Sequence, residues 1–175
     1  RTSIAAMTLR TGRALEQRFQ VPLAFSVESG LLTADVASLR ARGLDVDSLA
    51  DVLAREARSQ PGVVKVFTPR SLARAPATDE QARLWRRTIP SGQGWLVAAS
   101  VGPGWLWADS PGWTTHGTTQ PFDLGVPISF LGSGLKAQRV ARRVTTEDIG
   151  PTFAALAGVR PTEPVTGRVL MEVAG

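Results

Sequence analysis

The chain has 175 residues and a mass of 18.6 kDa, which is enough to bury a single-domain core without disulfides or a structural metal. Its 43% hydrophobic and 20% charged residues are typical of a packed globular protein and exclude intrinsic disorder, collagen-like and coiled-coil architectures. The net charge of +5 is carried mainly by arginines that are scattered among acidic residues, so we expect no nucleic-acid partner.

The start of the chain and its apolar runs indicate whether a signal peptide or a membrane segment is to be expected. The chain opens at Arg1 instead of a methionine and enters helix-like sequence at once, so we interpret it as cut from a longer polypeptide. Its first residues lack the charged, apolar and small-residue pattern of a signal peptide. No apolar run approaches the roughly 18 residues that a membrane-spanning helix needs, so we expect no membrane segment.

The first part of the chain alternates between helical and strand-like segments. One helix is predicted at 3–19, a second in a stretch that ends at Gly43, and a third after a cap at Asp45. Strands are predicted at 21–27, 31–33 and 63–67. This alternation is typical of a sheet that is covered by helices. We therefore expect residues 1–70 to form a small α/β lobe of strand, helix and strand.

Residues 71–175 contain the most apolar segment of the chain and its least regular one. Glycine bounds the apolar run at 95–101 on both sides, which predicts a buried central strand. Residues 102–125 show almost no periodicity, and such long loops inside compact domains usually carry function. The other predicted segments are a helix capped by Thr78, a strand at 126–131, and a helix capped by Thr145 or Thr146 and ended by Gly158.

Two residue types restrict the chemistry that this chain can perform alone. The absence of cysteine excludes disulfides, thiolate metal ligands and a cysteine nucleophile. His116 is the only histidine, so a multi-histidine metal centre would need another chain. Ser133 lies in a Gly132-Ser-Gly134 triplet and not in the Gly-x-Ser-x-Gly pattern of a nucleophile elbow, so a turn explains it better. We therefore assign no catalytic residue.

His116 lies in the irregular segment between two predicted strands, where α/β sheets place their sites. Gly117 would let the backbone approach a ligand closely, and the neighbouring threonines could hydrogen-bond a ring nitrogen. These features make His116 a candidate metal ligand or catalytic residue, although a lone histidine is more often a surface or structural residue. All five tryptophans lie between Trp85 and Trp113, and either core filling or a ligand-stacking platform explains them.

A longer pattern surrounds the histidine. Thr115-His-Gly-Thr is followed by Phe122-Asp, by Val126-Pro-Ile and later by the run Arg-Arg-Val-Thr-Thr-Glu-Asp-Ile-Gly-Pro-Thr-Phe. In this order, residues 114–171 resemble the C-terminal section of alkaline phosphatase superfamily enzymes, especially the phosphate-irrepressible alkaline phosphatases and the type I phosphodiesterases. Residues 43–68 more weakly resemble the preceding segment of the same enzymes.

The resemblance implies an α/β fold with an alkaline-phosphatase-like sheet flanked by helices, present here as an incomplete C-terminal portion. Residues 71–175 would be the C-terminal part of the catalytic domain, carrying the His-Gly-Thr loop. The resemblance also implies a zinc-dependent phosphoric ester hydrolase with two zinc ions, of which His116 would be one ligand. Its threonine or serine nucleophile would lie upstream of this chain. Two close metals suit the reaction because they stabilise both in-line oxygens.

On this interpretation the partners are a phosphate ester substrate and the missing N-terminal half of the same polypeptide. The enzyme would be bacterial and periplasmic or secreted, and this chain alone would be inactive. We also expect strands such as 95–101 to lose sheet neighbours and to expose apolar edges. The alternative is a noncatalytic α/β binding or scaffold module derived from the same fold.

Overall fold

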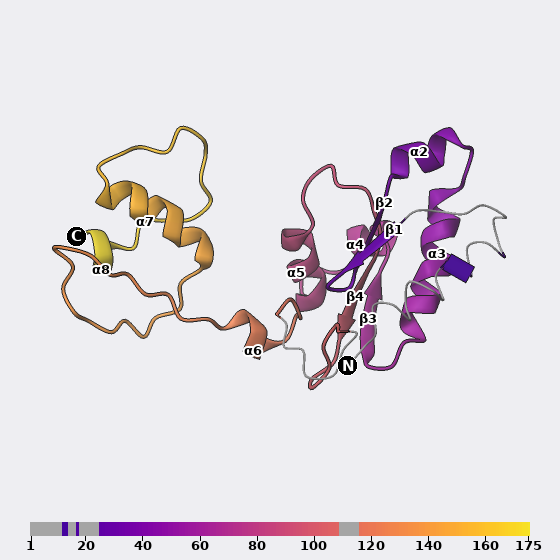
Figure 1. Cartoon of the computed structure of the whole chain (residues 1–175), viewed down its shortest axis with the longest axis horizontal. Helices are drawn as coiled ribbons and strands as arrows, with labels where there is room; N and C mark the ends of the chain where they lie inside the picture. Colours follow the sequence, from indigo (N-terminus) through magenta and orange to yellow (C-terminus); the bar gives the residue numbers. More distant parts are fainter. Residues whose placement is uncertain (1–11, 14–16, 18–24, 109–115) are drawn as a thin grey trace. The chain divides into compact units, whose positions relative to one another are not determined.

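The computed structural model describes residues 12–13, 17, 25–108 and 116–175. The chain divides into two compact units, residues 1–125 and residues 126–175, which we call the N-terminal and C-terminal units (Figure 1). The three described residues before position 25 are helical, and the rest of the helix expected at 3–19 lies outside the described residues.

One four-stranded sheet forms the centre of the N-terminal unit. Its strands are β1 (Phe25–Glu28), β2 (Leu31–Ala34), β3 (Val63–Phe67) and β4 (Trp95–Val101), in the spatial order β1-β2-β4-β3. Every neighbouring pair is antiparallel, so β2 and β3 run in the same direction with β4 inserted between them. The domain boundary expected at residue 70 falls inside this unit, because β4 follows that position in the sequence and completes the sheet.

The strands predicted at 63–67 and 95–101 have these same bounds in the structure. The strand expected at 21–27 is described only from Phe25, because residues 21–24 lie outside the described part. The prediction that β4 is central is confirmed, and six of its seven residues are buried. The expectation that it loses its sheet neighbours is wrong, since β2 and β3 pair with its two edges.

A two-residue turn at Ser29 and Gly30 joins β1 to β2. Both residues have positive φ, +46° and +86°, as a type I′ hairpin turn requires. Gly30 also lies tightly against β4: its carbonyl accepts a 2.8 Å hydrogen bond from the Ala99 amide. A Cβ built on Gly30 would lie 2.2 Å from the Ala99 carbonyl oxygen. Only glycine meets both demands at this position.

Helices form both connections to the inserted strand. Helices α2 (Val36–Ala41) and α3 (Val46–Arg58) lead from β2 to β3, and α4 (Pro69–Arg74) and α5 (Glu80–Thr88) lead from β3 to β4. Asp45 caps α3 as predicted, accepting a 3.1 Å hydrogen bond from the Asp47 amide. Helix α5 is capped by Asp79 instead of the expected Thr78. No helix in the described part of the chain has the length and apolar character of a membrane-spanning segment.

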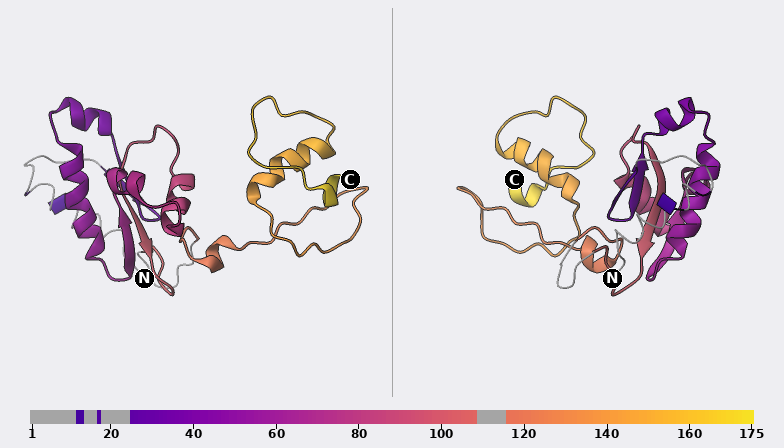
Figure 2. Two further views of the ribbon diagram at one scale, coloured as in Figure 1. Left: turned by 180° about the vertical axis from the view of Figure 1, so that it is seen from behind. Right: turned by 45° about the vertical axis from the view of Figure 1, so that its right-hand side comes forward.

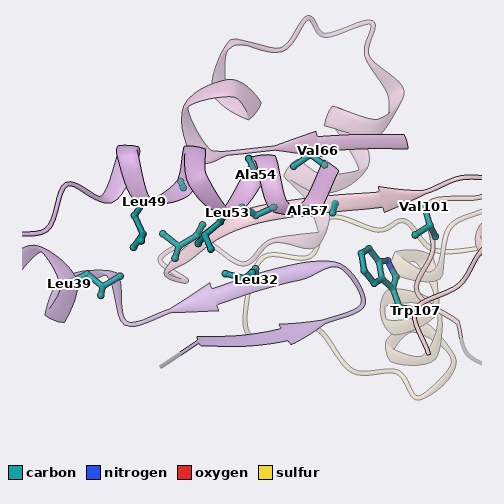
Figure 3. Packing of buried hydrophobic residues seen from close by; sticks show 13 residues of the cluster. Leu32, Leu39, Leu49, Leu53, Ala54, Ala57, Val66, Val101 and Trp107 are labelled. Atoms are coloured by element: carbon teal, nitrogen blue, oxygen red, sulfur yellow. The ribbon is translucent and has the colours of Figure 1, made fainter. Parts of the chain in front are cut away.

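The sheet is covered on both faces, and its alternating side chains form two cores. On one face Leu32, Val66 and Val101 pack with Leu53 and other apolar residues of α3 (Figure 3). On the other face are buried Phe67, Leu72, Ala82, Trp85 and Ala98, which come from the sheet, α4 and α5. Figures 1 and 2 show α3 and α5 on opposite faces. The N-terminal unit is therefore a three-layer α/β/α arrangement.

The C-terminal unit has little regular structure. It contains the short 3-10 helix η1 (Thr146–Asp148), α7 (Ile149–Leu156) and α8 (Met171–Ala174). Thr145 forms a capping box with Asp148, and Gly158 follows α7 with φ +66°, as predicted from the sequence. The strand predicted at 126–131 does not form, because no described strand pairs with it, and Leu131 is fully exposed.

Candidate functional site

His116 lies in the N-terminal unit, in the loop that follows β4. Its side chain is exposed, and it begins the described stretch 116–125. This stretch ends in the one-turn helix α6 (Pro121–Leu124). Along the sequence, the loop thus follows the central strand β4 and ends at the short helix α6.

Gly117, the neighbour of His116, packs against the β1–β2 turn. Its φ is +106°, and a Cβ built on it would lie 2.9 Å from Ser29 Oγ. We expected Gly117 to allow a close approach to a ligand, and in the structure the close approach is to Ser29. Ser29 is the only non-glycine residue with positive φ among the described residues. Two constrained turns therefore meet beside His116.

Hydrogen bonds within the loop hold the next residues. The Thr118 amide donates to Asp123 Oδ2 at 3.1 Å, and the Thr118 hydroxyl donates to the same oxygen. The Gln120 amide donates to Thr118 Oγ1 at 3.3 Å, and Gln120 Nε2 donates to the Val101 carbonyl at 2.7 Å. Thr118 and Gln120 are both buried. The Thr118 hydroxyl is thus used to hold the loop.

The described residues do not by themselves form a metal site. Among them, no group of three or more histidine, aspartate or glutamate side chains is placed to hold a metal ion. A zinc ion in a protein takes three or four protein ligands. In the described part of the chain His116 is therefore a single candidate donor, and any metal bound to it would need ligands from other residues.

The carboxylates with shifted pKa values have structural partners. The Asp148 pKa is lowered by hydrogen bonds from the backbone amide of Arg168, at 2.9 Å, and from Thr145. The Asp79 pKa is lowered by Lys65, whose ammonium lies 2.8 Å away. Both groups stay ionised at neutral pH, which suits a helix cap or an ion pair and not a general acid.

Among known proteins, the chain is similar to an alkaline phosphatase. No protein-family model matches the chain. The chain is 26% identical over 144 residues to alkaline phosphatase PafA of Elizabethkingia meningoseptica, an alignment that covers 75% of this chain and 24% of that enzyme. The chain is related to the alkaline phosphatase superfamily. The resemblance noted in the sequence is thereby confirmed at the level of the superfamily.

Solved structures of PafA share the fold. The wild-type enzyme matches with a TM-score of 0.80 and 21% identity over 100% of this chain and 34% of that chain. A variant with four substitutions matches with a TM-score of 0.74 and 20% identity over 99% of this chain and 35% of that chain. The predicted α/β class, with an alkaline-phosphatase-like sheet flanked by helices, is confirmed. The chain spans about a quarter to a third of the length of these relatives.

Three residues near His116 were given no structural role from the sequence, although Asp123 is part of the motif there. Ser29 lies more than eighty positions earlier, and only the folded hairpin brings it to Gly117. Gln120 and Asp123 are local, and the spacing Thr-x-Gln-x-x-Asp was a usable signal, because threonine and aspartate side chains often hydrogen-bond nearby backbone groups. Their bonds to Thr118 and Val101 fix the loop in the structure.

Proposed function

We propose that this chain is the C-terminal part of a phosphoric ester hydrolase of the alkaline phosphatase superfamily. The observation that carries the proposal is the sequence likeness to alkaline phosphatase PafA over three quarters of the chain. The His-Gly-Thr motif supports it, because its histidine is exposed in a loop held at the end of the central strand. Loops held by a rigid sheet commonly carry functional residues.

In this enzyme His116 supplies one ligand to a zinc ion. The other ligands and the threonine or serine nucleophile come from residues upstream in the complete polypeptide. The substrate is a phosphate monoester or diester. By likeness to its bacterial relative, we place the enzyme in the periplasm or outside the cell.

The test compares this chain with the longer polypeptide encoded by the same gene. Zinc content is measured by mass spectrometry, and hydrolysis is measured with p-nitrophenyl phosphate and with bis-p-nitrophenyl phosphate. We expect the 175-residue chain to hydrolyse neither substrate, because one imidazole does not complete a zinc site. The longer polypeptide should hydrolyse at least one of them, and a chelator should abolish the activity.

His116→Ala in the longer polypeptide tests the ligand assignment. It should lower zinc content to about one ion per chain and reduce turnover by orders of magnitude, with the fold intact. Gln93→Ala, an exposed polar substitution before β4, is the matched control. Near-native zinc and turnover in His116→Ala would make His116 a structural loop residue. A longer polypeptide with no zinc-dependent hydrolysis would favour the noncatalytic binding or scaffold module.

A further inference from the structure

We propose that Asp123 is a positioning residue that fixes the loop carrying His116. Its oxygen Oδ2 accepts two hydrogen bonds from one residue, the backbone amide and the hydroxyl of Thr118. Hydrogen bonds to an ionised carboxylate are stronger than those between neutral groups. These two bonds link Thr118 to Asp123, five residues later, and so close the loop. His116 lies two residues before the bonded amide. The catalytic importance of His116 rests on the proposed function, whereas the positioning does not.

Asp123 is itself held in place. It lies in α6, where Pro121 occupies the first turn with its φ already suited to a helix. The amides of Asp123 and Leu124 both donate to the Gln120 carbonyl, at 3.0 and 3.2 Å. The carboxylate therefore projects from a short rigid turn, so a bond to it restrains Thr118.

Gln120 ties the same loop to the sheet. Its buried side chain donates a 2.7 Å hydrogen bond to the carbonyl of Val101, the last residue of β4, and its own amide donates to Thr118 Oγ1. Thr118 Oγ1 thus accepts one bond from Gln120 and donates one to Asp123. Through these two partners, the position of Thr118 is defined relative to the central strand.

Gly117 provides no restraint of its own. Glycine populates positive and negative φ about equally, so the peptide between His116 and Thr118 is free to turn unless its ends are held. It packs closely on Ser29, where an added Cβ would lie 2.9 Å from Ser29 Oγ. If Asp123 loses its carboxylate, the amide and hydroxyl of Thr118 lose their common acceptor, and Thr118 Oγ1 keeps the bond from the Gln120 amide. We then expect the His116 ring, two residues before Thr118, to sample several positions.

The single histidine allows a direct test on the 175-residue chain without metal or substrate. Its imidazole gives one proton–carbon correlation in an NMR spectrum, and the Thr118 amide reports its own hydrogen bond through hydrogen exchange. The variants are Asp123→Ala, which removes both acceptor oxygens, and Asp123→Asn, which keeps one. Asp47→Ala on α3 is the matched control, because it removes an exposed carboxylate that pairs with Arg70.

We expect Asp123→Ala to lower the exchange protection of the Thr118 amide at least tenfold and to shift the His116 resonance toward that of an unstructured histidine. Asp123→Asn should retain an intermediate protection and shift, and Asp47→Ala should change neither. Slow exchange of the β4 amides verifies the fold in each variant. If Asp123→Ala fails to fold, Thr118→Val replaces it, with Thr118→Ser as the variant that restores the hydroxyl.

A His116 resonance that stays unchanged while Thr118 protection falls would overturn the proposal, because Asp123 would then brace only its own turn. Unchanged values for both would overturn it as well. Failure of zinc-dependent hydrolysis in the longer polypeptide would refute the proposed function and would leave these metal-free measurements unaffected. The two failures are therefore distinguishable.

Discussion

The indole Nε1 of Trp85 donates a 2.9 Å hydrogen bond to Ser100 Oγ, and both side chains are almost fully buried. The bond joins α5 to β4 across the second face of the sheet. It explains how a serine is accommodated in a strand that is otherwise apolar, since a buried hydroxyl without a partner would be costly. It also gives the largest ring of this core a fixed orientation.

Ser100→Ala should lower the free energy of unfolding by about 1–3 kcal/mol, because it leaves the buried Trp85 N–H without an acceptor. Urea unfolding monitored by circular dichroism measures this cost. In a Trp85→Phe background the donor is already absent, so the same substitution should cost much less. Equal costs in the two backgrounds would show that the hydrogen bond contributes nothing specific.

The sequence indicates which segments of the N-terminal unit are buried but not how they are ordered. The apolar run of β4 and the periodicity after Asp45 predict a central strand and a helix, and both are observed. The insertion of β4 between β2 and β3 depends on pairing between residues that are 31 to 67 positions apart in the sequence, which local pattern does not encode. The short helix α4 was also missed, although Thr68 before Pro69 is a known helix-start signal.

The site likewise contains one feature that the local sequence predicts and one contact that only the fold creates. His116 could be singled out because it is the only histidine and stands in a motif. The contact of Gly117 with Ser29 could not, because it arises from the hairpin turn folding over the loop. The strand predicted at 126–131 shows the converse case: strand-like sequence forms no strand where no neighbouring strand supplies hydrogen bonds.

Gly30→Ala should be among the most destabilising single substitutions in the N-terminal unit. A positive φ alone costs an alanine roughly 1–2 kcal/mol, and the added Cβ would also collide with the Ala99 carbonyl. Gly104→Ala is the matched control, because Gly104 has φ +76° and no atom within 4 Å of the added Cβ. Thermal unfolding should show a clearly larger loss for Gly30→Ala, and equal losses would mean that the β1–β2 turn moves away from β4 at little cost.

The C-terminal unit exposes most of the large apolar side chains that are exposed in the described residues. Leu131 is fully exposed, Phe153 is 56% exposed, and both line a hollow of about 280 Å³ with Phe130, Leu135 and Leu156. Contiguous apolar surface of this kind favours association. We therefore expect the 175-residue chain to bind the dye ANS and to self-associate at high concentration.

The double substitution Leu131→Ser and Phe153→Ser should reduce both ANS fluorescence and the associated fraction seen by analytical ultracentrifugation. Val64→Ser is the matched control, because Val64 is 62% exposed in the N-terminal unit and its removal should change neither. A wild-type chain that stays monomeric without binding ANS would contradict the prediction.

Glu172 and Arg142 form a bidentate ion pair in the C-terminal unit, with one of its two contacts, Nη2 to Oε2, at 2.7 Å. The Arg142 guanidinium lowers the Glu172 pKa from 4.5 to about 2. Because the folded-state pKa lies below the ordinary value, the stabilisation from this pair is fully present above pH 4.5. It is lost as the pH falls toward about 2, where Glu172 becomes protonated in the folded state.

A pH titration followed by the carboxyl carbon shift of Glu172 tests this pair. The wild-type chain should show a midpoint near 2, and Arg142→Gln should return the midpoint toward 4.5 because the neutral amide cannot favour the ionised carboxylate in the same way. Arg139→Gln removes another arginine of the same segment and should leave the midpoint low. The pair is exposed, so Arg142→Gln should change overall stability little at pH 7. A wild-type midpoint near 4.5 would show that the two side chains do not hold this geometry in solution.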